Sequence, residues 1–278
     1  LEHNVLLRRF TLSVGVLANY NSALNEGIHF YPGIDASYRI GDNVRLYGSW
    51  NRALRMPTFT DLYYEGKTNK GNPDLKPEES EAFEVGLKYN TYFLRAHIAG
   101  FYRKGKNMID WVKEKPEDIW ESQNLTKVDN LGFETNLSLL PRELGNERFF
   151  IRKIELGYAF IHQDKDSEGY ISNYALDYLK HKFTAQLSHS IWKGFSATWY
   201  VRWQDRAGSY TKYENLKPAY EEPYAPYCLV DMKVNWEYQR LNLYAELNNL
   251  LNSTYYDLGN IPQPGIWFKA GFRYSFKY

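Results

Sequence analysis

The sequence predicts an all-β protein, a transmembrane antiparallel up-and-down β-barrel of which about twelve strands are present in this chain. Three observations support this prediction. Apolar and polar residues alternate in about twelve separate segments, short and long connections alternate between these segments, and the chain ends on a long strand with an aromatic face. Successive side chains of a strand point to opposite faces, so each segment has one apolar and one polar face.

The final segment, 267–278, is the clearest of the predicted strands. One face carries Phe268, Ala270, Phe272, Tyr274, Phe276 and Tyr278. The other face carries Trp267, Lys269, Gly271, Arg273, Ser275 and Lys277. A soluble sandwich rarely ends on so long an aromatic strand. In an outer-membrane barrel such a strand is expected, because it closes the sheet while one face contacts lipid.

Eleven earlier segments alternate in the same way. They span residues 10–19, 34–40, 44–51, 83–89, 94–100, 131–139, 153–160, 182–188, 195–204, 230–237 and 241–248. Leu17 interrupts the polar face of the first segment. Each apolar face is long enough for a tilted strand to cross a bilayer, which takes about 9–11 residues.

The connections between these segments fall into two classes. Tight turns are predicted at 41–43, 90–91, 192–194 and 239–240. Long polar connections are predicted at 54–78, 104–126, 163–178, 205–225 and 253–264, and the connection at 140–149 is a longer turn on the side of the tight turns. Outer-membrane barrels have short periplasmic turns and long extracellular loops. We therefore place the long connections outside the cell.

Composition excludes several other classes of protein. The 278 residues suffice for one large all-β domain or two ordinary ones. Lys and Arg (34) nearly balance Asp and Glu (33), so no nucleic-acid partner is expected. The single cysteine, Cys228, excludes an internal disulfide framework and a Cys-based zinc site. No run of about 18 apolar residues exists, which excludes a helical membrane span.

The chain begins at Leu1, which is not an initiator methionine, and no signal-peptide pattern precedes the first predicted strand. We therefore expect the chain to be processed or to be a fragment of a longer protein.

Two stretches of the chain carry recognisable motifs. The first comprises NRALRMPTFTDLYY at 51–64, GNPDLKPEES at 71–80 and EVG at 84–86, and the second is LNNLLNSTYY at 247–256. With the aromatic end, these motifs resemble the TonB-dependent receptor family over residues 44–278. Members have an Arg-x-Pro run after a strand that runs towards the outer loops. A Gly-Asn-Pro-x-Leu-x-Pro-Glu-x-Ser run then opens the next strand, and an Asn-Leu-x-(Asn/Asp)-x-x-Tyr pattern precedes the closing strand.

The resemblance implies active uptake of a scarce, bulky solute across the bacterial outer membrane. Such receptors hold a globular plug inside a barrel of about 22 strands, and the TonB complex of the inner membrane drives its rearrangement. This chain contains neither a plug nor a TonB-contacting segment. The resemblance thus identifies residues 1–278 as the C-terminal portion of the barrel. The partners it implies are the TonB complex through the missing N-terminal part, outer-membrane lipid and a small-molecule solute, with a surface lipoprotein left open.

Most residues of the family motifs are expected to be structural. They are Arg55, Pro57, Leu62, Tyr63, Gly71, Asn72, Pro73, Leu75, Pro77, Glu78, Asn249, Leu250, Asn252 and Tyr255. The prolines remove ladder donors and fix φ, so they end strands and stiffen an outer loop. Glu78 and Ser80 are expected to satisfy exposed backbone groups, and Asn248, Asn249 and Asn252 to bond backbone at a strand end.

The resemblance also narrows the solute. Heme-type members carry a histidine between the first two runs, and no histidine lies between Pro57 and Asn72. No pair among the six histidines has convincing metal-ligand spacing with a carboxylate, so neither a metal nor a cofactor is expected. The run at 54–64 looks most like the vitamin B12 and ferric-siderophore branch, with cobalamin slightly favoured.

Aromatic residues of the outer loops are the candidate ligand contacts, because flat rings combine a large contact area with a polar group. The candidates are Tyr63, Tyr64, Trp111, Trp120, Tyr210, Tyr213, Tyr220 and Tyr224. The alternative for each is membership of the interfacial aromatic belt.

Three other classes compete with a receptor: a passive porin-like barrel, an outer-membrane barrel enzyme such as a phospholipase, and a soluble β-sandwich lectin. A lipase needs a Ser and a His on the same face. Ser188, His189 and Ser190 are consecutive, so Ser and His point to opposite faces. We therefore expect no enzyme activity.

Overall fold

The computed structural model describes residues 1–20, 27–115, 117–145, 148–166, 169–172, 178–214, 217–258 and 261–276. The chain divides into two compact units. Unit 1 comprises Leu1–Lys88, Ile98–Phe133 and Ile161–Tyr178. Unit 2 comprises Tyr89–His97, Glu134–Phe160 and Leu179–Tyr278.

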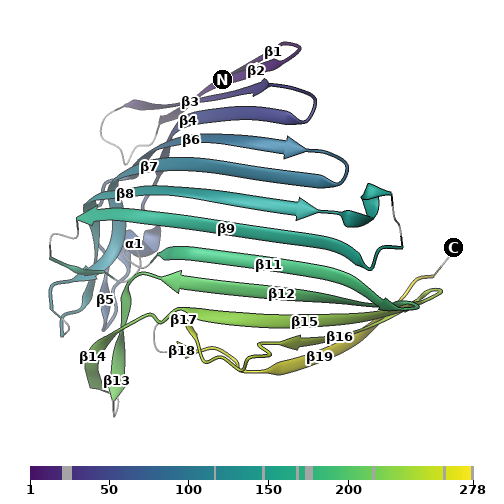
Figure 1. Ribbon diagram of the computed structural model, residues 1–278. Helices are drawn as coiled ribbons and strands as arrows, with labels where there is room; N and C mark the ends of the chain where they lie inside the picture. Colours follow the sequence, from purple (N-terminus) through teal and green to yellow (C-terminus); the bar gives the residue numbers. More distant parts are fainter. Residues whose placement is uncertain are drawn as a thin grey trace. The chain divides into compact units, whose positions relative to one another are not determined.

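Strands account for nearly all of the regular structure (Figure 1). In the first half they are β1 (Glu2–Leu6), β2 (Phe10–Tyr20), β3 (Ile28–Arg39), β4 (Val44–Arg55), β5 (Asn69–Lys70), β6 (Glu78–Asn90), β7 (Leu94–Lys113) and β8 (Trp120–Leu139). In the second half they are β9 (Ile151–Asp166), β10 (Ile171–Ser172), β11 (Leu179–Trp192), β12 (Phe195–Arg206), β13 (Ser209–Glu214), β14 (Lys217–Pro223), β15 (Tyr227–Tyr238), β16 (Leu241–Asn248), β17 (Tyr256–Leu258), β18 (Ile261–Pro262) and β19 (Trp267–Tyr274).

Two short helical elements interrupt the strands. They are the five-residue helix α1 (Phe59–Tyr63) and the 3-10 turn η1 (Pro141–Leu144). No helix among the described residues is long and apolar enough to cross a membrane.

The main sheet follows an up-and-down order. Its hydrogen-bonded path is β1-β2-β3-β4-β6-β7-β8-β9-β11-β12-β15-β16-β19, and β10 and β5 are added to β7 and β8. All predicted strands lie on this path, which confirms the all-β, antiparallel prediction. Among the described residues, β1 and β19 are the two ends of the path.

In unit 1, the register of β2, β3 and β4 aligns residues of one kind in rows. Val14, Ile34 and Trp50 stand directly opposite one another, and so do Ser13, Asp35 and Ser49. Because the side-chain period of a strand is two, the apolar rows share one face and the polar rows share the other.

In unit 2, β9, β11, β12 and β15 follow the same rule. Leu156, Ala185, Val201 and Val230 form one apolar row across the four strands. The tight turn before β12 requires a glycine. Gly194 has φ +75°, and an added Cβ would lie 2.5 Å from the backbone oxygen of Glu237. This close approach allows the pairing of β12 with β15 to begin directly after the turn, with Phe195 opposite Trp236.

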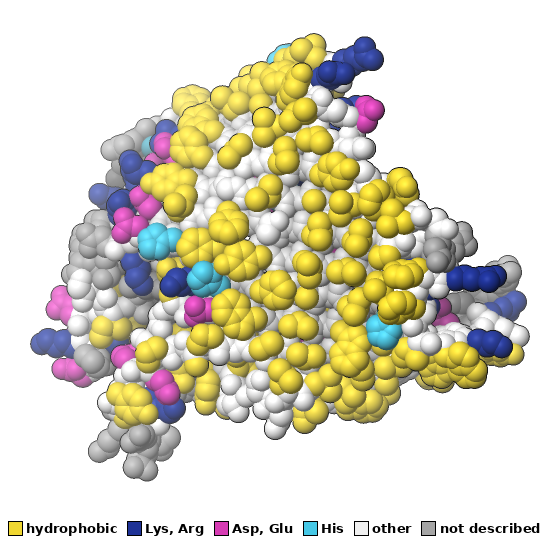
Figure 2. Space-filling view, in the orientation of Figure 1, with side chains coloured by type: hydrophobic (Ala, Val, Ile, Leu, Met, Phe, Trp, Pro, Cys, Tyr) yellow, Lys and Arg dark blue, Asp and Glu magenta, His cyan; other side chains and the backbone are white. Residues whose placement is uncertain are grey.

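The apolar face of the strands is exposed rather than packed into a core (Figure 2). The exposed residues include Trp192 and Phe195 at the short-turn ends and Leu156, Leu187 and Phe272 along the strands. In water so much exposed apolar surface would be unfavourable, whereas in a bilayer it contacts lipid. This face is therefore the lipid-facing surface.

The structure corrects the predicted connections. Strands β7 and β8 continue through most of 104–126, and 205–225 contains the hairpin of β13 and β14. Residues 54–78 contain α1 and β5, 163–178 contain the end of β9 and β10, and 253–264 contain β17 and β18. Strand β1 was not predicted. Strand β1 pairs with residues 11–15 of β2, but it is only five residues long and its sequence, EHNVL, does not alternate. The other segments lie beyond the crossing parts of the strands, where both faces of a strand can be polar.

Placing an arginine at the lipid-facing position Leu187 tests the orientation of the strands. Leu187 lies midway along β11 and is 37% exposed, and its neighbour Gln186 points to the other face and donates to Ser188 Oγ at 3.4 Å. We expect Leu187→Arg to lower the free energy of unfolding in phospholipid vesicles by about 2–4 kcal/mol. Gln186→Arg is the control. Equal effects of both substitutions would contradict the assigned faces.

Candidate functional site

The first motif folds into a compact lobe at the long-connection ends of β4 and β6. Thr58 is the N-cap of α1, with its Oγ1 accepting from the Asp61 backbone N–H at 3.1 Å. The Asp61 carboxylate accepts from the Thr58 backbone N–H at 3.0 Å. This reciprocal capping box satisfies two donors of the first turn, which explains why so short a segment is helical.

Three charged residues hold this lobe against the strands. Arg55 donates to Glu78 Oε1 at 2.5 Å and lies 3.4 Å from Asp61 Oδ2. Glu78 Oε1 also accepts from the backbone N–H of Ile109 on β7 at 2.8 Å. Glu78 and Asp61 are both 6% exposed. The charge of Arg55 and the backbone donors together compensate two buried carboxylates.

Gly71 closes the lobe on α1. Its backbone N–H donates to the backbone carbonyl oxygen of Tyr64 at 2.6 Å. The backbone N–H of Asn72 donates to the backbone carbonyl oxygen of Asp61 at 2.9 Å. An added Cβ on Gly71 would lie 2.8 Å from the Leu62 carbonyl carbon, so glycine alone fits. Leu75 is buried between the exposed Pro73 and the partly buried Pro77. The two backbone hydrogen bonds join residues 71 and 72 to the segment of α1.

The predicted aromatic contacts of unit 1 divide into two kinds. Tyr63 and Tyr64 are 63% and 50% exposed, and Tyr64 packs edge-on against Trp111 at 6.3 Å between centroids. Trp111 and Trp120 lie on β7 and β8, not in a loop as predicted, and both are half-buried. Lys113 Nζ lies 4.5 Å from the Trp120 ring centroid. The two tyrosines are thus the accessible members.

The second motif orders the connection before the final strand. The side chain of Asn249 is buried, and Asn249 is only 3% exposed. Its Nδ2 donates to the backbone carbonyl oxygen of Ser253 at 2.9 Å, and its Oδ1 accepts from the backbone N–H of Ser253 at 2.9 Å. Asn252 Oδ1 accepts from the Ile266 N–H at 3.0 Å. Both have positive φ, which asparagine tolerates. The backbone N–H of Leu250 donates to the Val230 oxygen at 2.8 Å, and Tyr255 packs on Tyr227.

The hairpin of β13 and β14 in unit 2 carries the other predicted aromatic contacts. Tyr210 and Tyr224 are buried, with ring centroids 5.1 Å apart, and Tyr210 also stacks on Tyr256 at 5.4 Å. Tyr213 and Tyr220 are 57% and 52% exposed. The buried pair therefore supports the hairpin, and the exposed pair faces solvent.

A charged pair joins the two strands of this hairpin. Lys212 donates to Glu222 at 2.5 Å, and the Tyr210 hydroxyl donates to the same carboxylate at 3.2 Å. The hydrogen bond from Lys212 lowers the pKa of Glu222, and the same bond raises the pKa of Lys212. Burial, followed by the charge of Glu222, raises the pKa of the Tyr210 hydroxyl.

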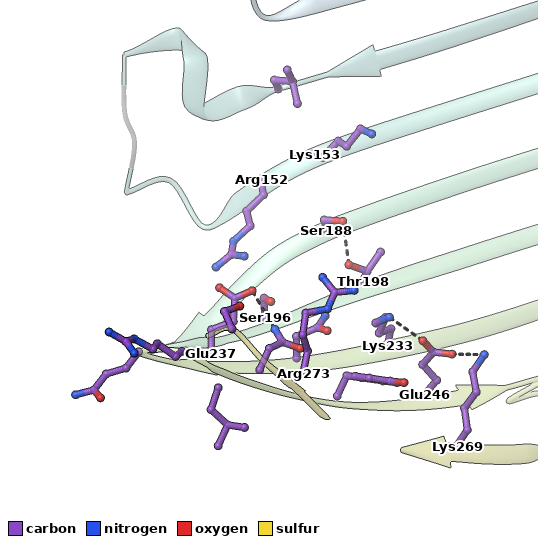
Figure 3. Close-up of a pocket in the computed structure, with 18 residues that line it drawn as sticks. Arg152, Lys153, Ser188, Ser196, Thr198, Lys233, Glu237, Glu246, Lys269 and Arg273 are labelled. Carbon is purple, nitrogen blue, oxygen red and sulfur yellow. Dashed lines mark hydrogen bonds and ion pairs between the residues drawn. The ribbon is translucent and has the colours of Figure 1, made fainter. Parts of the chain in front are cut away.

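A polar pocket in unit 2, with a volume of about 910 Å³, was not predicted (Figure 3). It lies on the polar face near the short-turn ends of β9, β11, β12, β15, β16 and β19. Glu246, one of its lining residues, accepts from Lys233 at 2.7 Å and from Lys269 at 2.5 Å. The alternation predicted that these side chains face inward, but only the register brings them together.

The histidines form no metal site with the acidic residues that the structure describes. His97 Nδ1 lies 3.7 Å from Glu134, and His181 shares a hydrogen bond with the Tyr158 hydroxyl at 2.8 Å. His189 Nε2 accepts from Trp199 Nε1 at 3.1 Å, whereas Ser188 pairs with Thr198 Oγ1 at 3.0 Å. Ser188 and His189 therefore have separate partners on opposite faces.

The fold and the two motifs can be compared with known proteins. The family model "TonB dependent receptor-like, beta-barrel" matches residues 7–250. The chain belongs to this family. Its members are outer-membrane receptors and transporters rather than enzymes, and the chain accordingly forms part of an outer-membrane β-barrel. The family assignment therefore agrees with the resemblance found in the motifs.

Among the curated relatives are a vitamin B12 transporter and a ferrienterobactin receptor. The vitamin B12 transporter BtuB of Vibrio vulnificus is 28% identical over 134 residues, which cover 43% of this chain and 21% of that protein. The ferrienterobactin receptor of Escherichia coli is 22% identical over 293 residues, which cover 95% of this chain and 37% of that protein. The chain thus spans well under half the length of these relatives.

Solved structures show the same fold. The ferric enterobactin receptor PfeA of Pseudomonas aeruginosa, in complex with enterobactin, superimposes with a TM-score of 0.76 at 19% identity. The match covers 99% of this chain and 44% of the receptor. The FrpB iron transporter of Neisseria meningitidis gives a TM-score of 0.72 at 17% identity, with coverages of 99% and 44%.

Replacing Glu78 tests the network that holds the first lobe. Glu78→Ala leaves the Ile109 N–H without its acceptor and Arg55 without its closest carboxylate, so we expect a loss of about 1–3 kcal/mol in the free energy of unfolding. The measurement is urea unfolding of the detergent-solubilised chain, with proteolysis of 54–78 as a local readout. Glu79→Ala is the control, because the Arg52–Glu79 pair is 3.5 Å apart and exposed. Equal losses would contradict the role of Glu78.

The Lys212–Glu222 pair predicts a pH window for the hairpin. Folding lowers the pKa of Glu222 below its ordinary value of 4.5. The free energy that the pair contributes to folding is therefore fully present above pH 4.5 and is lost as the pH falls through the lowered pKa of Glu222. Folding raises the pKa of Lys212 above its ordinary value of 10.5. The same free energy is therefore fully present below pH 10.5 and is lost as the pH rises through the raised pKa of Lys212. NMR titration of the Glu222 carboxyl carbon should give a midpoint below 4.5, which Lys212→Gln moves upward. An unchanged midpoint in the variant would refute this assignment.

Proposed function

We propose that the chain is the C-terminal barrel portion of a receptor that takes up a scarce, bulky solute across the outer membrane with energy supplied by the TonB complex. The match of the family model over residues 7–250 carries this proposal. The TonB complex would act through a part of the protein outside these residues. A surface lipoprotein is a further proposed partner.

Cobalamin is the first candidate solute. The run at 54–64 resembles the vitamin B12 and ferric-siderophore branch of the family, and two curated relatives of 28% and 25% identity are named vitamin B12 transporters. A ferric siderophore is the second candidate, because the relative with 95% coverage of this chain is named a ferrienterobactin receptor. The two solutes differ in charge and metal, so uptake assays separate them.

The accessible tyrosines are the proposed contacts. Tyr63 and Tyr64 are exposed on the first lobe, and Tyr213 and Tyr220 are exposed on the hairpin. Tyr63 lies in α1 and Tyr64 packs against Trp111, whereas Tyr213 and Tyr220 lie on the hairpin whose buried Tyr210 packs on Tyr224 and Tyr256. An aromatic ring held on a rigid support loses little conformational entropy on binding, which favours affinity.

Uptake by a deletion strain tests the solute. We expect cells without the complete gene to lose uptake of labelled cyanocobalamin at trace concentration, and the restored gene to recover it. Normal cyanocobalamin uptake with lost ferric-catecholate uptake would transfer the assignment to a siderophore. Normal uptake of both solutes would refute the proposed function.

Replacing exposed tyrosines tests the contact residues. In the complete receptor, we expect Tyr213→Ala combined with Tyr220→Ala to weaken solute binding about tenfold, equivalent to about 1.4 kcal/mol. Tyr92→Ala is a matched control, since Tyr92 is 69% exposed in a tight turn at the opposite ends of the strands. Binding is measured by equilibrium titration in detergent. Unchanged affinity in the double variant would exclude the hairpin tyrosines as contacts.

A further inference from the structure

The first lobe, which connects β4 to β6, is also attached to the outer parts of β7 and β8. Strand β5 of the lobe runs parallel to β8 with Asn69 opposite Trp120, and it lies beside the long-connection end of β8 in Figure 1. The backbone N–H of Trp120 donates to the backbone carbonyl oxygen of Thr68 at 2.9 Å. So short a pair of strands is weak by itself, so other contacts must fix the position of the lobe.

The side chain of Asn124 on β8 joins the lobe to both β8 and β7. Its Oδ1 accepts from the backbone N–H of Lys76 at 2.8 Å, and its Nδ2 donates to the backbone carbonyl oxygen of Lys76 at 2.9 Å. The Nδ2 also donates to the backbone carbonyl oxygen of Asn107 on β7 at 2.7 Å. A carboxamide has two donor hydrogens and an acceptor, so Asn124 pairs with both backbone groups of Lys76, as a neighbouring strand would, and still reaches Asn107.

The backbone of Asn107 suits this junction. Its φ is +53°, in the left-handed region that glycine and asparagine adopt more readily than other residues. Two residues further along β7, the backbone N–H of Ile109 donates to Glu78 Oε1 at 2.8 Å. Lys76 and Glu78 are therefore both held at one short segment of β7, the first through Asn124 and the second directly.

These attachments determine where the exposed tyrosines of the lobe stand. Tyr64 packs edge-on against Trp111 of β7, with 6.3 Å between ring centroids. The lobe is closed internally by the hydrogen bond from the Gly71 N–H to the Tyr64 carbonyl oxygen. Loss of the attachment at Lys76 would therefore let Tyr64 move relative to Trp111.

Asn124 itself is not placed to bind a solute. Both hydrogens of its Nδ2 are used by backbone carbonyl groups, and the residue is partly buried. Tyr63 and Tyr64 are by contrast 63% and 50% exposed. The role open to Asn124 is therefore to position the lobe that carries these rings.

We propose that Asn124 is a positioning residue for solute binding, which holds the first lobe on β7 and β8 so that Tyr63 and Tyr64 meet the solute in an arrangement that exists before binding. A contact surface formed in advance loses less conformational entropy when the solute binds. Asn124 lies outside both family motifs, and this inference rests on the function proposed above. A lobe that instead closes over the solute as a flap would bind equally well or better without the attachment.

Solute binding by the complete receptor in detergent tests the inference, with cyanocobalamin and a ferric catecholate as the two probes. We expect Asn124→Ala to weaken binding of the probe that the wild type binds by about fivefold. Asn124→Asp keeps the acceptor but loses both donors, so it should weaken binding as much. Asn43→Ala is the matched control, because Asn43 is exposed in the tight turn between β3 and β4.

The possible failures of this experiment are distinguishable. Unchanged or tighter binding by folded Asn124→Ala, with folding shown by heat-modified gel mobility, would overturn the inference alone. A wild-type receptor that binds neither probe would refute the proposed function, and this inference with it.

A comparison of two backgrounds separates positioning from general stabilisation. With Tyr63→Ala and Tyr64→Ala the lobe has no tyrosine rings left to position, so adding Asn124→Ala should change the affinity by less than about twofold. With Tyr213→Ala and Tyr220→Ala the lobe is intact, so adding Asn124→Ala should again weaken binding about fivefold. Equal effects in the two backgrounds would overturn the positioning role.

Substitutions of Asn107 test the same junction without altering Asn124. The junction uses the backbone carbonyl of Asn107, so Asn107→Gly should leave the affinity unchanged. Asn107→Val disfavours the positive φ and should weaken binding about threefold. Equal affinities of these two variants would contradict a role of the junction in solute binding.

Discussion

Pairing of backbone groups between neighbouring strands is the constraint on which the rest of this structure depends. In a bilayer no water is available, so every N–H and C=O of a crossing strand needs a partner on the adjacent strand. The resulting register determines which side chains stand opposite one another. It aligns Val14, Ile34 and Trp50 in one apolar row and Lys233, Glu246 and Lys269 in one polar row. The lipid-facing surface and the polar pocket therefore have one common cause.

A different set of interactions organises the long-connection ends, where water competes for backbone groups. Two buried carboxylates, Asp61 and Glu78, accept hydrogen bonds from backbone donors that strand pairing leaves unsatisfied. Arg55 compensates their charge, and Gly71 permits backbone contact with α1 that any side chain would prevent. Rigid lobes of this kind hold exposed aromatic rings in defined positions, which a flexible loop could do only at a large cost in conformational entropy.

The sequence predicted the crossing strands well because the bilayer imposes alternation on them. It did not predict the outer parts of β7 and β8 or the β13–β14 hairpin, because strands outside lipid can be polar on both faces. For the same reason Trp111 and Trp120 were assigned to a loop. It also did not predict β1, which has only five residues and no alternation. The burial of Tyr210 depends on contact with Tyr256, which lies 46 residues further along the chain, and no local pattern records such a contact.

The polar pocket shows most clearly what register adds to alternation. Alternation alone placed Lys233 and Lys269 on the polar face, but pairing through β16 brought both onto Glu246. The chain as a whole has a formal charge of only +1, yet this wall carries a clear excess of cations. If protein fills the space beside the wall, unpaired guanidinium groups would lose water at a cost of several kcal/mol each. The cations of the wall are therefore compatible either with a water-filled space or with an occupant that supplies carboxylates.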